Sequence, residues 1–378
     1  RFHTRAELYR MVRRLCGKRV SFLEVSHAWE QAEAFVRSGR RRLREAWRQA
    51  AAGDRMRVLL LGRPYTVLSA DMNKRIPEMF AALGVPTGYQ DMLPIDPQPA
   101  DDIRPLTDEL HWHHAARILA AARQVADDPD LYPVLVTAFK CTPDTLTGDY
   151  FQQLMERTGK PYLVLQLDEH GSGLGYETRI EAAVRAFRSH HRPTRWRPTV
   201  QPAATGLSPC SRRSRPDRTL LLPNWDRLTM PLIAAALQRE GIDARVLEET
   251  PGGIRRAMRH NGGQCIPLNI VAQGFKDYVT NHDLDPARTG LWVGEGSIAC
   301  NLKLYPHHIQ TLLQRFGGGM ERAQVFAGPI SMADISLRMP YHVYFAYMFG
   351  GLLRRAGCRL RPYEAHRGET DRVIEGCL

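Results

Sequence analysis

YPVLVTAFKCTPDTLTGDYFQQLMERTGKPYLVLQLDE, residues 132–169, is the stretch that decides the fold of this chain. It predicts an apolar strand over residues 134–139 that runs into Cys141, then a helix, and then a second apolar strand over residues 162–167. Two strands joined through a helix by short connections indicate a βαβ unit in a parallel sheet. Cys141 is therefore expected at the carboxyl edge of that sheet, where α/β proteins bind their ligands.

Two other cysteines occur in the same kind of place. Cys265 precedes a predicted helix with a proline at its start, and Cys300 follows the strand-like residues 291–293. The positive end of a helix dipole favours the thiolate, which is the form that binds metal. We therefore interpret Cys141, Cys265 and Cys300 as one three-thiolate metal site. The long separations between them exclude compact zinc fingers and bacterial ferredoxin runs, and spacing alone favours three unrelated structural cysteines.

The whole chain predicts an α/β protein with two doubly wound, Rossmann- or flavodoxin-like parallel sheets behind an N-terminal helical segment. Its 378 residues, 43% of them hydrophobic, suffice for two cores. Strands and helices alternate through two bodies, and a last strand is expected near residues 359–363. The predicted division is a basic helical segment, a first α/β domain, a Pro/Arg-rich linker, a second α/β domain and a tail, at residues 1–55, 56–188, 189–218, 219–365 and 366–378.

The net charge of +12 is concentrated outside the two predicted bodies. Residues 1–55 carry 14 Arg and Lys against 6 Asp and Glu, and the linker is also rich in arginine. The bodies contain no zinc-finger spacing and no basic surface interleaved with aromatic residues, so nucleic-acid binding is not expected. Docking to an acidic partner domain explains the same charge.

The chain shows no membrane or secretion signal. No apolar run approaches the roughly 20 residues of a membrane span, and there is no signal-peptide pattern. Seven cysteines, an odd number spread over a long chain, favour reduced thiols and a cytoplasmic location. The first residue is Arg1 rather than Met, which suggests a piece of a longer polypeptide.

Several other motifs do not predict a site. The glycine run at residues 171–175 fails as a dinucleotide loop because Tyr176 stands where the third glycine should be, and no P-loop occurs. The neighbouring histidines His113 and His114 cannot share one helix face with His111, so a metal site there is not expected. Four cysteines are not expected to be ligands, and Cys358 is predicted to pack at a helix–strand junction; the four are Cys16, Cys210, Cys358 and Cys377.

Polar residues beside the thiolates are candidates for supporting roles. Asp168, Glu169 and Glu295 are candidates for proton transfer, with helix capping and loop hydrogen bonds as an equally good alternative. Three further side chains are expected next to the metal site or, alternatively, as ordinary turn residues at the ends of strands; they are Arg63, Lys140 and Asn301.

Four segments resemble a known family. They resemble the large CoA-enzyme activases, relatives of the 2-hydroxyacyl-CoA dehydratase subunits and of the double-cubane cluster reductases. The stronger resemblance lies in LLLGRPYTVLSADMNKRIPEMFAALGV and FKCTPDTLTGDYFQQLMERTGKPYLVLQLDEHGSGLGYETRIEAAVRAF. The weaker one lies in GGQCIPLNIVAQGFKDYV and SIACNLKLYPHHIQTLL.

The resemblance implies an iron–sulfur cluster, [4Fe-4S] or double cubane, held by Cys141, Cys265 and Cys300. It also implies an actin/Hsp70-like ATPase, as a domain or a subunit, that delivers low-potential electrons at the expense of ATP. In the dehydratases, one-electron reduction of an acyl-CoA thioester gives a ketyl radical that expels the β-positioned leaving group. The order of the cysteine segments differs here, because Cys141 comes first.

The sequence therefore predicts the iron–sulfur component of an ATP-dependent low-potential reductase or dehydratase system, with a homo-oligomer as a further possibility. The alternative from another class is a clusterless interaction or regulatory module of a larger activase polypeptide. A nucleotide- or CoA-binding transferase rests only on the two α/β bodies and ranks last, because a fold alone does not specify function.

Overall fold

In a computed structural model of the chain, the described residues are 2–50, 55–95, 100–138, 142–168, 173–191, 218–295 and 300–378. They form two compact units, and neither is continuous in sequence. The first unit comprises Arg1–Pro97, Gln124–Thr137 and Gly159–Pro198, and the second comprises Gln98–Arg123, Ala138–Thr158 and Thr199–Leu378. The domain boundaries expected from the sequence stay a prediction.

The first unit is built on a parallel four-stranded sheet in the order β2-β1-β3-β4. Its strands are β1 (Arg57–Leu61), β2 (Thr87–Tyr89), β3 (Leu131–Ala138) and β4 (Leu163–Leu167). The register of β1 against β3 pairs Arg57 with Leu131 and Leu61 with Leu135. Both strands are almost entirely buried, as expected for parallel strands inside an α/β body.

Helices in the first half of the chain extend the predicted βαβ pattern. Those before β3 are α3 (Pro64–Val67), α4 (Ile76–Ala82), α5 (Arg104–Glu109) and α6 (His113–Asp127). Those after it are α7 (Thr142–Thr158) and α8 (Leu174–His191). Residues 192–217, which hold most of the predicted linker, lie outside the described residues.

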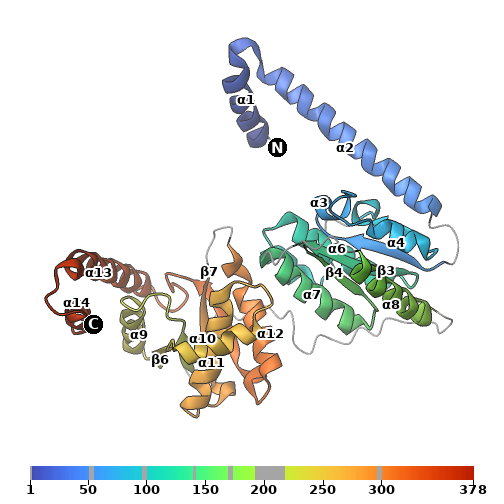
Figure 1. Ribbon diagram of the computed structural model, residues 1–378. Coiled ribbons are helices and arrows are strands. Elements are labelled where there is room, and N and C mark those ends of the chain that lie inside the picture. The colour runs from blue at the N-terminus through green and yellow to red at the C-terminus, as the bar shows by residue number, and fades with distance from the viewer. Residues whose placement is uncertain are drawn as a thin grey trace. The chain divides into compact units, whose positions relative to one another are not determined.

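Two N-terminal helices, α1 (Phe2–Cys16) and α2 (Phe22–Ala50), confirm the predicted helical segment (Figure 1). Most of the α2 surface is exposed, but Trp47 near its end is buried. The Trp47 ring packs on Gly88 of β2 so closely that a Cβ atom on Gly88 would lie 2.5 Å from it. The Arg57 guanidinium also lies 5.6 Å from the centre of the Trp47 ring. One tryptophan thus fastens the end of α2 to the first sheet.

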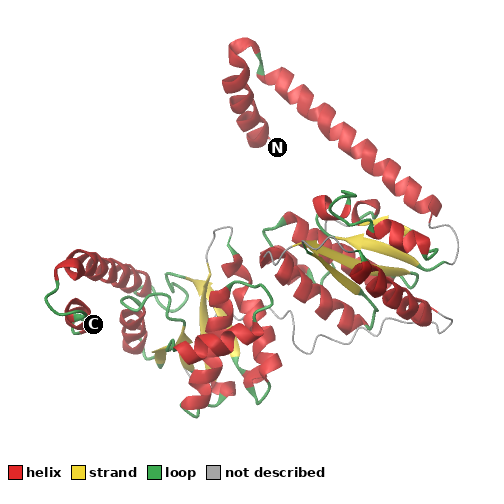
Figure 2. Cartoon of the chain, in the orientation of Figure 1, coloured by secondary structure: helices red, strands yellow, loops and turns green. Residues whose placement is uncertain are grey.

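The second unit contains a second parallel four-stranded sheet with the equivalent order, β6-β5-β7-β8 (Figure 2). Its strands are β5 (Thr219–Leu222), β6 (Ala244–Val246), β7 (Thr289–Glu295) and β8 (Gln324–Pro329). The helices that connect and follow them are α9 (Met230–Arg239), α10 (Pro251–Ala257), α11 (Ile266–Asn281), α12 (Tyr305–Phe316), α13 (Met339–Leu360) and α14 (Glu369–Glu375).

Both faces of the second sheet are covered. Leu221, Leu291 and Val293 join one apolar core with α11 and α12, and the intervening Leu222 and Trp292 join another with α9 and α13. This division follows from the alternation of side chains along a strand. The predicted fold class, α/β with two parallel sheets and an N-terminal helical segment, is confirmed.

Three details of the sequence prediction were wrong. Residues 359–363 form the end of α13 and a 3-10 turn, Arg361–Tyr363, rather than a strand. Pro362 has no N–H to donate to a sheet, so it favours this outcome. Cys358 consequently lies exposed on α13 and not at a helix–strand junction. The short helices α10 and α14 were not predicted.

Candidate functional site: the carboxyl edge of the second sheet

The strand order of the second sheet creates a ligand-binding edge. Strand β5 lies between β6 and β7. The connection after β5 leads to β6 on one side of it, and the connection after β6 leads to β7 on the other side. Loops that diverge in this way open a crevice at the carboxyl ends of the strands. Pro223 follows β5, and Gly294 lies near the end of β7, so both belong to this edge.

Cys265 lies at the N-terminus of α11, as the sequence predicted. It is the residue that precedes the helix, and Pro267 occupies one of the first two helical positions. The thiol is partly buried against the core formed with α11 and α12. The Tyr305 hydroxyl donates a hydrogen bond to the Cys265 sulfur over 2.9 Å, from the first residue of α12.

Cys300 lies close to the same tyrosine. It precedes a short 3-10 helix, Asn301–Leu304, that leads directly into Tyr305, and its side chain is exposed. Burial is the main cause that raises the pKa of Tyr305 above its usual value, and the hydrogen bond to Cys265 and the charges of Cys265 and Cys300 raise it further. Tyr305 therefore stays protonated at neutral pH and can donate to sulfur. Tyr305 thus contacts Cys265 directly, and the charge of Cys300 also acts on its hydroxyl group.

Cys141 falls outside the described residues, but the helix that follows it reaches the Cys265 loop. Asp149 on α7 accepts a hydrogen bond of 2.6 Å from the side chain of Gln264, the residue before Cys265. Asp149 lies seven residues after Thr142, the start of α7, which is about 10 Å along a helix. One hydrogen bond therefore connects the α7 segment to the turn that carries Cys265.

The same aspartate lies beside a buried histidine. His308 on α12 is fully buried, its Nδ1 atom is 3.9 Å from an Asp149 carboxylate oxygen, and neither of its ring nitrogens has a hydrogen-bond partner in the described part of the chain. Burial lowers the pKa of His308 to about 4, although the Asp149 carboxylate opposes the shift. The imidazole is therefore neutral at pH 7, and the contact is not a pair of opposite charges.

Two more buried polar groups close to this edge lack a partner within the described residues. Both side-chain atoms of Asn269, one turn after Cys265 on α11, are buried and unpaired. The indole N–H of Trp292 on β7 is also buried and unpaired. Since most buried polar groups are hydrogen-bonded, these two are candidates to bind a ligand.

An apolar cavity of about 250 Å³ lies at this edge. The residues that line it come from β7, from the loops after β5 and β8, from the 3-10 helix Asn301–Leu304, and from α9 and α13. They include Trp225, Trp292, Leu302, Ile330, Met332 and Tyr347. The Trp225 ring lies 6.3 Å from the Tyr305 ring, which connects the cavity wall to the two cysteines. Few polar groups and an apolar lining are typical of sites that hold small organic ligands.

The remaining predicted site residues are scattered. Asp168, in the first unit, accepts a hydrogen bond of 3.1 Å from the Tyr176 hydroxyl, which supports its alternative interpretation as a loop-stabilising residue. Arg63 precedes the short helix α3, and Asn301 follows Cys300. Glu295 is the last residue of β7. Glu169 and Lys140, like Cys210, lie outside the described residues.

The three-thiolate site itself stays a prediction. Among the residues that the structure describes, no group of three or more His, Cys, Asp or Glu side chains comes together as a metal site. Cys141 is not among those residues, so only two of the predicted ligands are described. The cysteines that were expected not to be ligands, Cys16, Cys358 and Cys377, are exposed.

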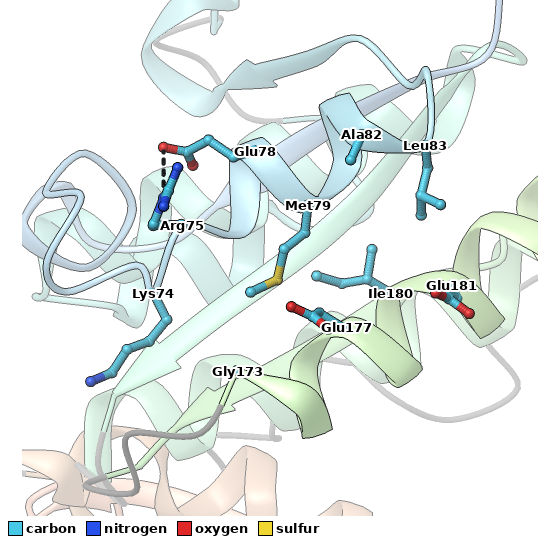
Figure 3. Close-up of a pocket in the computed structure, with 10 residues that line it drawn as sticks. All are labelled: Lys74, Arg75, Glu78, Met79, Ala82, Leu83, Gly173, Glu177, Ile180 and Glu181. Carbon is cyan, nitrogen blue, oxygen red and sulfur yellow. Dashed lines mark ion pairs between the residues drawn. The ribbon is translucent and has the colours of Figure 1, made fainter.

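A second hollow lies in the first unit between α4 and α8 (Figure 3). It has a volume of about 550 Å³, with Met79, Leu83 and Ile180 on its apolar side. Its rim is charged, and Arg75 pairs with Glu78 over 3.7 Å. The lining residues include no cysteine or histidine, so the groove offers contact surface rather than thiolate or imidazole chemistry.

The sequence analysis missed Tyr305, Gln264 and His308. The Tyr305–Cys265 and Gln264–Asp149 contacts join residues 40 and 115 positions apart. Local sequence patterns do not contain such pairings. His307 and His308 are both buried on α12, but a pair of neighbouring histidines does not by itself indicate a site in the sequence.

Comparison with known proteins is consistent with the sequence motifs. Residues 2–93 match the family described as the CoA enzyme activase uncharacterised domain (DUF2229). The match contains α1, α2, β1 and β2. Trp47 of α2 packs on Gly88 of β2, so the N-terminal helix and the sheet strands of the matched region are in contact. No curated protein and no solved structure matches the chain.

None of the helices in the described ranges combines the length and hydrophobicity that a membrane span requires.

The matched residues overlap the first of the segments that resemble the activases, from residue 59 onward. The suspected relationship is thereby confirmed from an independent direction. Residues 2–93 of this chain thus match a domain described for CoA enzyme activases, the family that the sequence motifs suggested.

Proposed function

We propose that this chain is the iron–sulfur component of an ATP-dependent low-potential reductase or dehydratase system of the 2-hydroxyacyl-CoA dehydratase type. Cys141, Cys265 and Cys300 would hold a [4Fe-4S] or double-cubane cluster. The observation that carries the proposal is the position of Tyr305, which donates to the Cys265 sulfur and lies within electrostatic reach of Cys300. The activase family match supports the ATP-dependent partner.

The described residues fit such a cluster chemically. Thiolates are the usual ligands of iron–sulfur clusters, and hydrogen bonds to their sulfurs tune the reduction potential. The Tyr305 hydroxyl supplies one such bond, and the unpaired Asn269 amide one turn from Cys265 offers another donor. When bound, the cluster would supply single electrons at low potential.

The apolar cavity suggests what the electrons act upon. Its volume of about 250 Å³ fits a small acyl group rather than a whole coenzyme. The buried Trp292 indole N–H can donate to an oxygen of that group. The ring contact between Trp225 of the cavity wall and Tyr305, which bonds to Cys265, supports a position of that group near the thiols. The role of these residues would be to orient the acyl group and exclude water.

The electron donor would be an actin/Hsp70-like ATPase. Helix α2 exposes Phe35, Val36 and Leu43 and carries six arginines of the basic N-terminal segment. An acidic partner surface would complement this charge. A cytoplasmic location follows from the proposal, since a low-potential centre and free thiols require a reducing compartment.

The second candidate is a clusterless docking module, which the same exposed surface of α2 favours. Anaerobic purification with iron and sulfide analysis and EPR of the reduced protein separates the two. We expect bound iron, acid-labile sulfide and an EPR signal after reduction. An anaerobically reconstituted protein that holds neither iron nor sulfide would leave only the docking module.

A further inference from the structure

Helix α13 is apolar on two opposite faces. One face packs into the second unit through Met339, Val343, Ala346 and Gly350, next to α9 (Figure 1). The other face is exposed to solvent. We define the outer stripe as five large apolar side chains that are 50–69% exposed, which are Tyr341, Tyr344, Phe345, Met348 and Leu352.

The outer stripe has the spacing of a helix–helix interface. Its members follow one another at intervals of three, one, three and four residues, which places them on one side of an α-helix. The rings of Tyr344 and Phe345 lie edge to face, with their centres 5.7 Å apart. A helix that is apolar on both faces is expected to be covered on both.

We propose that the outer stripe is the surface through which two copies of this chain pair, with their α13 helices antiparallel and a two-fold axis passing near Met348. A two-fold interface must match itself, so each residue of one copy meets a complementary residue of the other. The stripe meets this condition when Met348 faces the partner's Met348.

The antiparallel arrangement gives each aromatic side chain a suitable neighbour. Phe345 then faces the partner's Gly351, and a Cβ atom on Gly351 would have no atom within 4 Å, so this position is an open notch. Tyr341 faces the partner's Arg355, which continues the stripe one helical turn beyond Leu352. A guanidinium over a tyrosine ring is a favourable contact.

The area of the stripe also fits a second copy. Its three aromatic rings, Met348 and Leu352, with Phe349 at the margin, expose about 600–700 Å² of side-chain surface on one copy. A standard interface buries about 800 Å² per partner, and homodimer interfaces are enriched in aromatic and apolar side chains. The stripe therefore supplies most of one half of a stable interface, and this holds whether or not a cluster binds.

Sedimentation velocity of the 378-residue chain tests the proposal. We expect a dimer at about 10 µM and, for Phe345→Glu, a dissociation constant raised at least about 100-fold. Phe35→Glu, at an equally exposed site on α2, is the matched control and should leave the dimer unchanged. Far-UV circular dichroism should be the same for all three proteins. A wild-type chain that stays monomeric at about 100 µM would overturn the proposal.

Disulfide cross-linking tests the antiparallel arrangement. In a background with the exposed cysteines Cys16, Cys300, Cys358 and Cys377 changed to serine, Met348→Cys lies on the proposed axis and should cross-link two copies under mild oxidation. Tyr341→Cys lies on the same stripe, about two helical turns before Met348. It should not cross-link, because it faces the partner's Arg355. Cross-linking through Tyr341→Cys but not Met348→Cys would contradict the antiparallel pairing.

Discussion

The side-chain amide of Gln264 donates a hydrogen bond of 2.6 Å to the carboxylate of Asp149. Gln264 directly precedes Cys265, and Asp149 lies on α7, the helix that follows Cys141 in sequence. The bond therefore ties the helix after one predicted ligand to the turn that carries another. Its geometry supports the proposal that distant thiolates serve one site.

This bond can be measured with a double-mutant cycle of Gln264→Ala and Asp149→Ala. Hydrogen bonds to charged groups contribute about 1.5–3 kcal/mol, so each single change should lower the free energy of unfolding by roughly that amount. The double variant should lose much less than the sum, because the two changes remove the same contact. Urea unfolding at pH 7 provides the values, and strictly additive losses would show that the two side chains do not interact.

Acid should destabilise the protein through His308. The folded-state pKa of about 4 lies below the usual value of 6.5, so between these values the unfolded state binds a proton that the folded state does not. The contribution of the neutral His308 side chain to the free energy of unfolding is complete above pH 6.5 and is lost as the pH falls toward 4. The free energy of unfolding should drop by about 2 kcal/mol between pH 7 and 5 from this group alone.

The His308 ring lies edge to face with the Tyr150 ring, with their centres 6.4 Å apart. His308→Phe keeps a ring in this place and removes the titration. Urea unfolding of this variant should show a flatter dependence on pH than the wild type between pH 5 and 7. Equal slopes in the two proteins would mean that His308 is protonated as readily in the folded chain as in the unfolded one.

Lys160 in the first unit should make stability rise with pH in the same direction, but in the alkaline range. Burial lowers its pKa to about 8 from 10.5, against the attraction of Asp128 and other nearby aspartates. Its ammonium group lies 4.6 Å from the centre of the Tyr132 ring. Between pH 8 and 10.5 the unfolded state holds the proton and the folded state does not, so stability rises with pH.

We expect Lys160 to add about 1 kcal/mol of stability between pH 7 and 9. Lys160→Met removes the charge while keeping much of the side-chain volume. The rise should therefore be absent from the unfolding curves of Lys160→Met. A variant that gains as much stability as the wild type over this range would contradict the lowered pKa.

Trp47 should decide whether α2 stays attached to the first sheet. Its ring is buried on Gly88, and removal of a buried tryptophan costs about 3–5 kcal/mol. Trp47→Ala should increase amide hydrogen exchange in β2 and at the end of α2. Phe35→Ala, at an exposed position of α2, should stay within about 0.5 kcal/mol of the wild type and leave exchange in β2 unchanged.

The sequence predicted the two sheets because their strands carry a strong local signal. Residues 58–61 and 131–136 are almost continuously apolar, as parallel strands buried on both faces must be. The apolar residues of α9 recur with helical spacing, which is likewise a local signal. These features depend on neighbouring residues and can be recognised without knowledge of the fold.

The sequence prediction missed one short helix and placed a strand where a helix ends. Helix α10 begins with Pro251-Gly252-Gly253, which reads as a loop, yet the Thr250 hydroxyl accepts a hydrogen bond from the Gly253 N–H and starts the helix. A strand was expected near residues 359–363, but α13 continues through Leu360. Gly357, near its end, is still buried on the face of α13 that packs into the second unit.

The candidate site was predictable only in its cysteines. Cys265 and Cys300 stand where strands and helices meet, which sequence patterns reveal. Tyr305, which donates a hydrogen bond to Cys265, is brought there by the packing of α12 against α11. Such a contact depends on the complete fold, and so does the buried, unpaired indole of Trp292.

Iron content after anaerobic reconstitution, measured across a panel of single Cys→Ser variants, tests the central claim most directly. The account predicts that Cys141→Ser, Cys265→Ser and Cys300→Ser each lose the cluster iron and its EPR signal, whereas serine at Cys16, Cys210, Cys358 or Cys377 leaves both at the wild-type level. Equal iron in all seven variants, or loss of iron from any of the four control variants alone, would contradict it.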